Sequence, residues 1–390
     1  MPTALIWNDD RIHYNFGPHH PLKPIRVELT VDLIRACGLT DRPGVLTLPR
    51  AAFGDDDVLR LHTRDYVEVV RALSDAPDPT GNMRYGLGYG DNPVFGGMHE
   101  ASLEVCGASV AAAQAVWEGT ATHAFNPAGG LHHAFADRAA GFCIYNDPAF
   151  AIDWLLQHGA TRIAYIDVDT HHGDGVQVMY YRDPRVLTLS LHESGRYLFP
   201  GTGFPDEIGE ADGRGSSLNV PLAPATIGEV WLEAFEQVVP PALDAFRPQV
   251  LVTQLGCDTH VTDPLAHLAL TTDDYIEIAK RLHALAHRYC DGRWVALGGG
   301  GYQITSVVPR AWTIYFAELV GGGLPAEVPW SWLRKAEEAG RREGGEAPPT
   351  SFHEGTPRLA AERIAATRKD AFDAVEQLKR AAFDLLARLA

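Results

Sequence analysis

The chain is organised around residues 163–175, which read Ile-Ala-Tyr-Ile-Asp-Val-Asp-Thr-His-His-Gly-Asp-Gly. The apolar beginning is typical of a buried strand in a parallel sheet. Asp167, Asp169 and His171 follow at a spacing of two, which places their side chains on one face of an extended chain. Charged groups at the end of a buried strand are costly unless they pair or bind a cation. A ligand site is therefore favoured over residues that only cap a strand, because other stretches supply matching partners.

The composition is that of an ordinary globular protein. The 390 residues are 46% hydrophobic and 21% charged, enough for one large α/β domain or two smaller ones. No apolar run approaches the length of a membrane span, and residues 1–7 lack the pattern of a secretory signal. Five scattered cysteines fit reduced thiols in a cytoplasm. A net charge of −17 argues against a nucleic-acid surface. We therefore expect a cytoplasmic protein with no membrane or nucleic-acid partner.

Strands and helices are predicted to alternate along the chain, which predicts an α/β fold with a mainly parallel central sheet flanked by helices. The expected strands lie at 3–7, 122–126, 163–167, 186–192, 250–256 and 294–297. The expected helices lie at 27–36, 65–73, 101–117, 148–157, 228–246, 273–290 and 306–319. A single domain would cover 1–320. Residues 321–357 are predicted to be a linker or loose surface excursion, and 358–390 a C-terminal helix packed on the domain or on a partner subunit.

Four of the predicted strands run into reactive side chains. These are His132 and His133 after a double glycine, the acids and histidines of 163–175, Asp258 after Cys257, and Tyr302 after the glycines at 298–301. Taken alone, the histidine pair could be a loop feature, Asp258 a helix cap, and the glycine run a phosphate cradle, although no phosphate-loop or dinucleotide motif fits. The carboxyl ends of parallel strands meet at one edge of a sheet. The combination therefore predicts one composite site.

Six motifs follow one another along the chain. They are Gly-Gly-Leu-His-His-Ala (129–134), Gly-Phe-Cys-Ile-Tyr-Asn-Asp (141–147), Asp-Val-Asp-Thr-His-His-Gly-Asp-Gly (167–175), Phe-Pro-Gly-Thr-Gly (199–203), Gln-Leu-Gly-Cys-Asp-Thr (254–259) and Leu-Gly-Gly-Gly-Gly-Tyr (297–302). With these motifs in this order, the chain resembles the zinc-dependent histone deacetylase superfamily over roughly residues 1–320, and within it the bacterial acetoin-utilisation deacetylases. The resemblance implies the arginase–deacetylase fold.

The resemblance implies that Asp169, His171 and Asp258 bind a catalytic zinc ion. Three protein ligands leave a coordination position open, as catalytic zinc sites require. Two carboxylates with one imidazole also suit Fe²⁺, so the sequence leaves the native metal open. The family also has structural potassium sites. One could be formed here by backbone carbonyls of Asp167, Asp169, His171 and Leu191, together with Ser190.

The same resemblance assigns the acid–base chemistry. It implies that His133 is the general base that takes a proton from the attacking water and then protonates the leaving lysine amine, while His132 assists electrostatically. Asp167 would orient His132, and Asp174 would orient His133, fixing the tautomer and basicity of each ring. Tyr302 would donate its hydroxyl to the substrate carbonyl oxygen as that oxygen becomes an oxyanion. Acetate is then the second product.

The family binds the acyl-lysine stem in a narrow tube, and an alkyl stem without polar groups needs apolar walls. The residues of this chain that match the substrate-binding set are Gly141, Phe142, Phe199, Leu265 and Gly300. Asp91 matches an aspartate at the rim that holds the substrate backbone; the alternative is an ordinary turn acid. Arg26 resembles an arginine near an internal acetate exit; the alternative is a surface salt bridge.

The leading expectation is a lysine deacetylase acting on acetylated proteins or peptides, with cytoplasmic metabolic enzymes such as acyl-CoA synthetases as targets. An acetylpolyamine amidohydrolase is the first alternative, and would favour an acidic gate where this chain has Leu265. A binuclear manganese ureohydrolase needs a second set of acids of the type Asp-Ala-His-x-Asp, which is absent. A binding module that holds acetyl-lysine or acetoin without cleaving it is disfavoured because His132, His133, Asp174 and Tyr302 are all present.

Overall fold

In the computed structural model, which describes residues 1–10 and 12–389, eight parallel strands form one sheet in the order β2-β1-β3-β8-β7-β4-β5-β6. The strands are β1 (Thr3–Ile6), β2 (Val45–Leu48), β3 (His123–Asn126), β4 (Ile163–Asp167), β5 (Val186–Glu193), β6 (Ser217–Leu222), β7 (Val250–Gln254) and β8 (Trp294–Leu297). The predicted parallel sheet is confirmed, and it also contains two edge strands, β2 and β6, that the sequence does not predict. Arg11 and Ala390, the last residue of the predicted C-terminal helix, lie outside the described residues.

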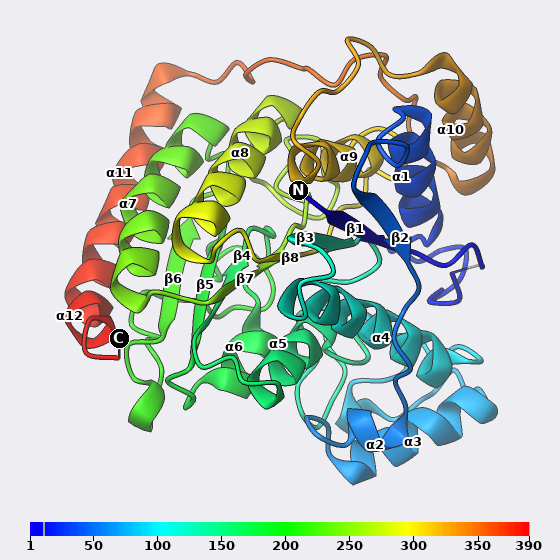
Figure 1. The fold of residues 1–390 in the computed structure, drawn as a ribbon, viewed down its shortest axis with the longest axis horizontal. Coiled ribbons are helices and arrows are strands. Elements are labelled where there is room, and N and C mark those ends of the chain that lie inside the picture. Colours follow the sequence, from blue (N-terminus) through cyan, green and yellow to red (C-terminus); the bar gives the residue numbers. More distant parts are fainter. Residues whose placement is uncertain (11, 390) are drawn as a thin grey trace.

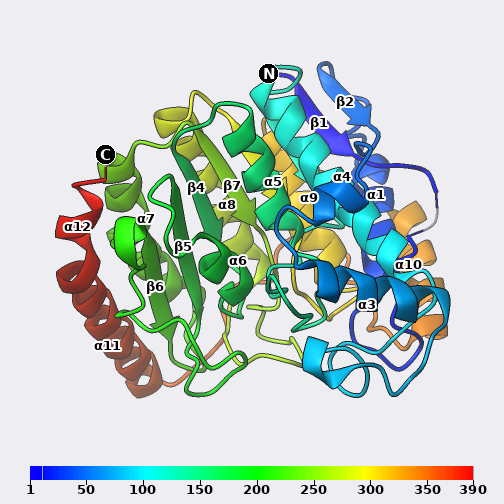
Figure 2. The ribbon, with the colours of Figure 1, turned by 90° about the horizontal axis from the view of Figure 1, so that it is seen from below.

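Helices cover both faces of the sheet (Figures 1 and 2). One face carries α4 (Met98–Trp117), α5 (Asp147–Gln157) and α6 (Asp174–Tyr180), and α2 (Asp55–Val58) and α3 (Arg64–Asp75) lie beside α4. The other face carries α1 (Ile25–Ala36), α7 (Gly228–Phe246), α8 (Thr272–Tyr289) and α9 (Val308–Leu319). Alternate residues of each strand supply the two cores, as the two-residue period of a strand requires. Ile163 and Tyr165 pack towards α5, whereas Ala164 and Ile166 pack towards α7 and α8. Within the described residues, none of these helices has the length and apolar character that crossing a membrane requires.

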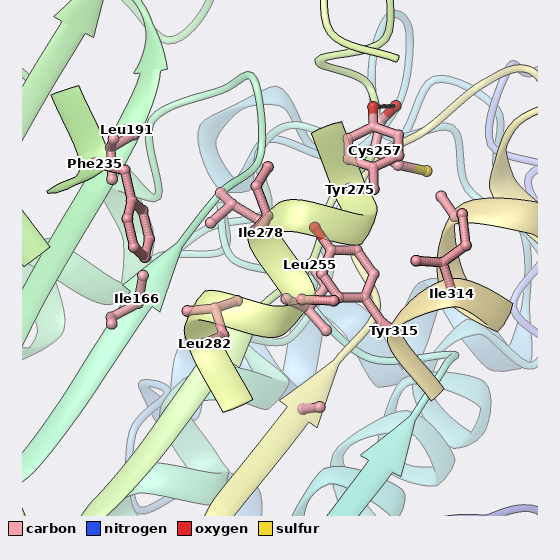
Figure 3. Packing of buried hydrophobic residues seen from close by; sticks show 14 of the residues in the cluster. Ile166, Leu191, Phe235, Leu255, Cys257, Tyr275, Ile278, Leu282, Ile314 and Tyr315 are labelled. Atoms are coloured by element: carbon pink, nitrogen blue, oxygen red, sulfur yellow. Dashed lines mark hydrogen bonds between the residues drawn. The ribbon is translucent and has the colours of Figure 1, made fainter. Parts of the chain in front are cut away.

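The larger core lies between the sheet and helices α7, α8 and α9, and it supports the end of β7. Figure 3 shows Leu255 and Cys257, which follow β7, beside Tyr275 of α8 and Tyr315 of α9. The Tyr275 hydroxyl donates a hydrogen bond to the backbone carbonyl of Cys257 across 2.8 Å. The backbone next to Asp258 is therefore held by buried packing.

The segment at 321–357 differs from the predicted linker or loose excursion. It contains α10 (Trp330–Glu343), which packs on α1. Trp332 is buried there, and its indole N–H donates to the backbone carbonyl of Leu29 across 2.8 Å. The buried residues of α10 recur at helical spacing between charged ones. The many charged residues and the flanking Gly and Pro therefore obscure the sequence pattern of an amphipathic helix.

The C-terminal region packs on its own domain. It consists of α11 (Ala361–Leu378), a π-helical turn (Lys379–Phe383) and α12 (Asp384–Leu386). α11 lies against α7 and the edge strand β6 (Figure 1). Arg368 of α11 pairs with Glu229 and Glu233 of α7. Covering an edge strand in this way removes a template for unwanted strand pairing.

Candidate active site

The predicted site residues follow four strands that lie side by side at the centre of the sheet, in the order β3-β8-β7-β4. The histidine pair follows β3, the acids and histidines of 163–175 follow β4, Asp258 follows β7, and Tyr302 follows β8. Parallel strands end at a common edge, so these distant segments meet there. The sequence predicts the convergence, but the adjacency of the four strands emerges only from the fold.

Asp169, His171 and Asp258 form a buried cluster in which one ligand atom of each residue lies within 4.8 Å of the others. Nδ1 of His171 lies 3.1 Å from Oδ1 of Asp169 and 3.0 Å from Oδ2 of Asp258. Burial, followed by the charge of Asp169, raises the pKa of Asp258 to about 6. Two buried carboxylates that face each other favour a cation between them. The donor set of one imidazole and two carboxylates fits a divalent metal with an open coordination position.

The carboxylate oxygens of this cluster are oriented by neighbouring donors. Oδ2 of Asp169 accepts hydrogen bonds from Nε2 of Gln254 at 2.7 Å and from the backbone N–H of Gly300 at 2.8 Å. Oδ1 of Asp258 accepts the backbone N–H of Thr170 at 2.9 Å. These contacts turn the remaining oxygens towards His171. A Cβ at Gly300 would lie only 2.1 Å from Oδ2 of Asp258, so a side chain there would displace the carboxylate.

Each of the two histidines, His132 and His133, pairs with one aspartate. Nδ1 of His132 lies 2.7 Å from Oδ2 of Asp167, and Nδ1 of His133 lies 2.7 Å from Oδ1 of Asp174. Each Nδ1–H therefore donates to a carboxylate, which leaves Nε2 of each ring directed at the other across 3.0 Å. The pairing of each histidine with its acid agrees with the sequence prediction.

The environment shifts the pKa values of the two histidines in opposite directions. Burial lowers the pKa of His132, but Asp167 and Asp169 outweigh it and raise that pKa to about 9. Burial, followed by the positive charge of His132, lowers the pKa of His133 to about 4. These shifts favour the protonated form of His132 and the neutral form of His133. A neutral ring can accept a proton, whereas a fixed cation can stabilise negative charge nearby.

A cavity leads to these groups. Its lining is formed by Leu22, Gly130, Leu131, His132, His133, Gly141, Phe142, Cys143, Asp169, His171, Gly299, Gly300 and Tyr302. The Phe142 and Tyr302 rings meet edge-on with centroids 5.8 Å apart, and the half-exposed Phe199 ring lies 5.0 Å from that of His133. Gly141 has φ +50°, and a Cβ there would lie 2.4 Å from the His133 ring. The cavity thus combines polar groups at its base with aromatic walls.

Tyr302 is held by an acid to which the sequence analysis gives no role. Oδ2 of Asp263 accepts the Tyr302 backbone N–H at 2.9 Å, and Oδ1 accepts that of Leu265 at 2.9 Å. Burial raises the pKa of the Tyr302 phenol well above its ordinary value, so the hydroxyl keeps its proton and can donate it. Asp263 stands before a proline in a loop, where an ordinary turn residue would give the same sequence signal.

Arg26 is buried on α1 and does not form the surface salt bridge that was its alternative. Its Nη1 donates to the backbone carbonyl of Gly301 at 2.9 Å, and the guanidinium lies 5.0 Å from the ring centroid of Trp312. Arg26 therefore contacts the backbone of Gly301, the residue that precedes Tyr302.

The remaining predicted residues lie farther from the acid–histidine cluster. Asp91 is exposed on the loop after α3, and its backbone carbonyl lies 3.1 Å from Nε2 of His20, whose ring contacts Phe142 at a centroid distance of 4.5 Å. Leu265 is half-buried beside Asp263 and is absent from the cavity lining given above. Ser190 lies opposite Asp167 in the β4–β5 register, and Leu191 follows it. The potassium site proposed for these strands stays a prediction.

Sequence reasoning also misses residues that orient the acids or shape the cavity. The Tyr165 hydroxyl donates to Oδ2 of Asp167 at 2.6 Å, and Gln254 fixes Asp169. Both are polar groups in otherwise apolar buried strands, and that signal could have identified them. Leu22 and His20 come from an N-terminal loop, and only the tertiary fold places Leu22 in the cavity lining and His20 against Phe142.

Comparisons with known proteins agree with this geometry. A family model described as the histone deacetylase domain matches residues 20–319. The chain is 45% identical over 334 residues to the acetoin utilization protein AcuC of Bacillus subtilis (strain 168), covering 85% of this chain and 86% of that protein. It is 36% identical over 335 residues to the AcuC protein of Staphylococcus xylosus, with the same coverage of 85% and 86%.

Two solved structures resemble the fold over nearly the whole chain. A crystal structure of an HDAC homolog complexed with SAHA superposes with a TM-score of 0.83 at 31% identity. That of an HDAC homolog from Aquifex aeolicus superposes with a TM-score of 0.81 at 32% identity. In both cases the match covers 95% of this chain and 100% of the other.

Proposed function

The chain belongs to the histone deacetylase family, of the acetoin-utilisation type, and is a hydrolytic deacetylase; we propose that the bond it hydrolyses is the amide of N6-acetyl-lysine on proteins or peptides. One observation carries this proposal. The acid–imidazole cluster, the His132–His133 pair and the Tyr302 phenol all lie at the carboxyl ends of neighbouring strands, and members of all three groups line one cavity with an aromatic wall.

Asp169, His171 and Asp258 would hold a divalent ion, which we propose to be zinc, with Fe²⁺ as the alternative. Such an ion acts as a Lewis acid on a carbonyl and increases the acidity of water. Gln254, Gly300 and Thr170 keep the two carboxylates in place by the hydrogen bonds described above. The chain therefore supplies both the ligands and the groups that orient them.

His133 would act as the general base and then as the general acid. Its Nδ1–H is fixed on Asp174, so Nε2 holds the lone pair that accepts a proton from the attacking water. The same Nε2 then returns the proton to the lysine nitrogen as the C–N bond breaks, which releases the amine and acetate. His132, held by Asp167, would in its protonated form stabilise the negative charge that forms on the oxygens around the reacting carbon.

Tyr302 would donate its hydroxyl hydrogen to the carbonyl oxygen as that oxygen becomes negative. Asp263 positions the Tyr302 backbone, and the buried Arg26 lies behind Gly301, where it would attract the acetate product. Phe142 and Phe199 would flank the alkyl stem, together with Gly141, Gly300 and Leu265. Asp91 on its exposed loop would accept backbone N–H groups of an extended peptide.

The physiological substrates proposed are acetylated metabolic enzymes of the cytoplasm, with acyl-CoA synthetases as the leading candidates. The test compares kcat/KM on an acetyl-lysine peptide with kcat/KM on acetylputrescine, using enzyme of measured metal content. We expect the peptide to be the better substrate and acetate to be released in equal amount to the free lysine. A clear preference for the polyamine would replace this proposal by an acetylpolyamine amidohydrolase.

A further inference from the structure

A second cluster of metal-binding side chains lies at the other end of β3 from the active site. His123 is the first residue of β3, whereas His132 and His133 follow its last residue, Asn126. His283 and His287 lie four residues apart on α8, which places them on the same face of that helix. One ring nitrogen from each of these three histidines lies within 4.8 Å of the other two.

The Nε2 atoms of the three rings converge. Nε2 of His287 lies 3.2 Å from Nε2 of His123 and 3.0 Å from Nε2 of His283. Three nitrogen ligands of a tetrahedral zinc ion, each about 2.0–2.1 Å from the metal, lie roughly 3.3 Å apart. The observed spacings are close to that value.

The outer nitrogens of two rings are already fixed. Nδ1 of His123 lies 2.9 Å from the backbone carbonyl of Leu319, and Nδ1 of His283 lies 2.9 Å from Oε1 of Glu318. A carbonyl oxygen and a carboxylate only accept, so Nδ1 of each ring carries the hydrogen. In the neutral rings, Nε2 of His123 and of His283 is therefore a lone pair. A carbonyl or carboxylate partner on the outer nitrogen is the arrangement that metal-binding histidines usually show.

With these tautomers there are too few hydrogens to make a hydrogen bond at each contact between the three Nε2 atoms. Nε2 of His287 can carry one hydrogen and donate it to either His123 or His283. At its contact with the other histidine, two nitrogen lone pairs then face each other. A metal ion accepts all three lone pairs at once.

We propose that His123, His283 and His287 form a structural binding site for a divalent transition-metal ion such as zinc, separate from the active site. Imidazole nitrogen suits Zn²⁺, Cu²⁺ and Ni²⁺ rather than Mg²⁺ or Ca²⁺. His283 and His287 are only partly buried, so solvent reaches the cluster and can supply a fourth ligand. The ion would tie the start of β3 to α8 and, through Glu318 and Leu319, to the end of α9.

The test measures zinc binding to metal-stripped protein by elemental analysis after gel filtration. Wild type should bind two equivalents of Zn²⁺. Asp258→Ala and His287→Ala should each bind one, and the double variant none. The control, His158→Ala, removes an exposed histidine that stacks on Trp154, and should bind two equivalents. Refilled with one equivalent, His287→Ala should deacetylate at the wild-type rate, because His287 has no place in the active site.

A thermal measurement covers the case in which a variant is too unstable for stoichiometry. Zn²⁺ should raise the Tm of Asp258→Ala, because an ion that binds only the folded state stabilises it, but should leave the Tm of the double variant unchanged. Failure of Asp258→Ala to bind Zn²⁺, or two equivalents bound by His287→Ala, would overturn the second site. If instead wild type and Asp258→Ala bind one equivalent each and His287→Ala binds none, the histidine site stands and the proposed catalytic zinc does not.

Discussion

The side chain of Asp263 fixes the backbone of Tyr302: one carboxyl oxygen accepts the Tyr302 N–H across 2.9 Å, and the other accepts the N–H of Leu265. Asp263→Asn keeps the shape of the side chain but replaces one acceptor oxygen by an NH₂ group. We expect kcat to fall by up to about 100-fold, because a misplacement of about 1 Å in a reacting group can cost that much. Metal content should not change.

A double-mutant cycle checks whether Asp263 acts through Tyr302. Tyr302→Phe alone should lower kcat by about 10²–10³-fold, as for the loss of one oxyanion donor. If Asp263 only positions Tyr302, the double variant should be little slower than Tyr302→Phe. Losses that multiply in full would show an independent role for Asp263 and contradict this account.

The histidine pair gives a second prediction. His133→Ala removes the neutral ring that accepts the proton, and should lower kcat by about 10²–10⁴-fold while the metal stays bound. His132→Ala removes only a supporting positive charge and should lower kcat less. The measurement is steady-state kinetics on protein of known metal content. A nearly active His133→Ala beside an inactive His132→Ala would mean that the two roles are reversed.

The rim gives a third prediction. Asp91 is exposed and can accept backbone N–H groups of a peptide, which a polyamine does not possess. A hydrogen bond to a charged group contributes about 1.5–3 kcal/mol, so Asp91→Ala should lose roughly 10- to 100-fold in kcat/KM on an acetyl-lysine peptide. The loss on acetylputrescine should be small. Equal losses on the two substrates would remove Asp91 from peptide recognition.

Acid stability gives a fourth prediction, at Glu354 in the segment between α10 and α11. Oε2 of Glu354 lies 2.7 Å from Nε2 of His260, and its other oxygen pairs with the buried Arg310. Burial raises the pKa of Glu354, but His260 and Arg310 outweigh it and hold that pKa well below its ordinary value. A carboxyl whose pKa is lower in the folded state stabilises the fold above its unfolded pKa of about 4.3, and this contribution fades as the pH falls.

Glu354→Gln should therefore lower the free energy of unfolding at pH 7 by about 1–3 kcal/mol, the cost of losing a charged hydrogen-bond partner. The difference from wild type should shrink below about pH 4. Urea unfolding at pH 7, 5 and 3.5 measures it. A difference that stays constant over this range would mean that the charge of Glu354 contributes nothing to stability.

The sequence predicts the active-site residues of this protein better than it predicts peripheral elements such as β6 and α10. The site residues His132, Asp169, Asp258 and Tyr302 are recognisable because each follows an apolar run within a few residues. The edge strand β6 contains Pro221, which is tolerated at an edge but weakens the strand signal. α10 is missed because its buried residues, among them Trp332, are few and surrounded by charge. Asp263 gains its role only from its contact with Tyr302 across the fold.

The most direct test of the central claim is acetate release from an acetyl-lysine peptide by wild type and by Asp258→Ala, with metal content and circular dichroism recorded on the same samples. Asp258 follows the carboxyl end of β7, outside the hydrophobic core, so its removal should leave the fold intact. Asp41→Ala, which removes an exposed carboxylate, is the matched control. We predict that Asp258→Ala loses the active-site ion and falls to background turnover, while Asp41→Ala equals wild type. Wild-type turnover by folded Asp258→Ala would contradict a metal-dependent deacetylase built on Asp169, His171 and Asp258.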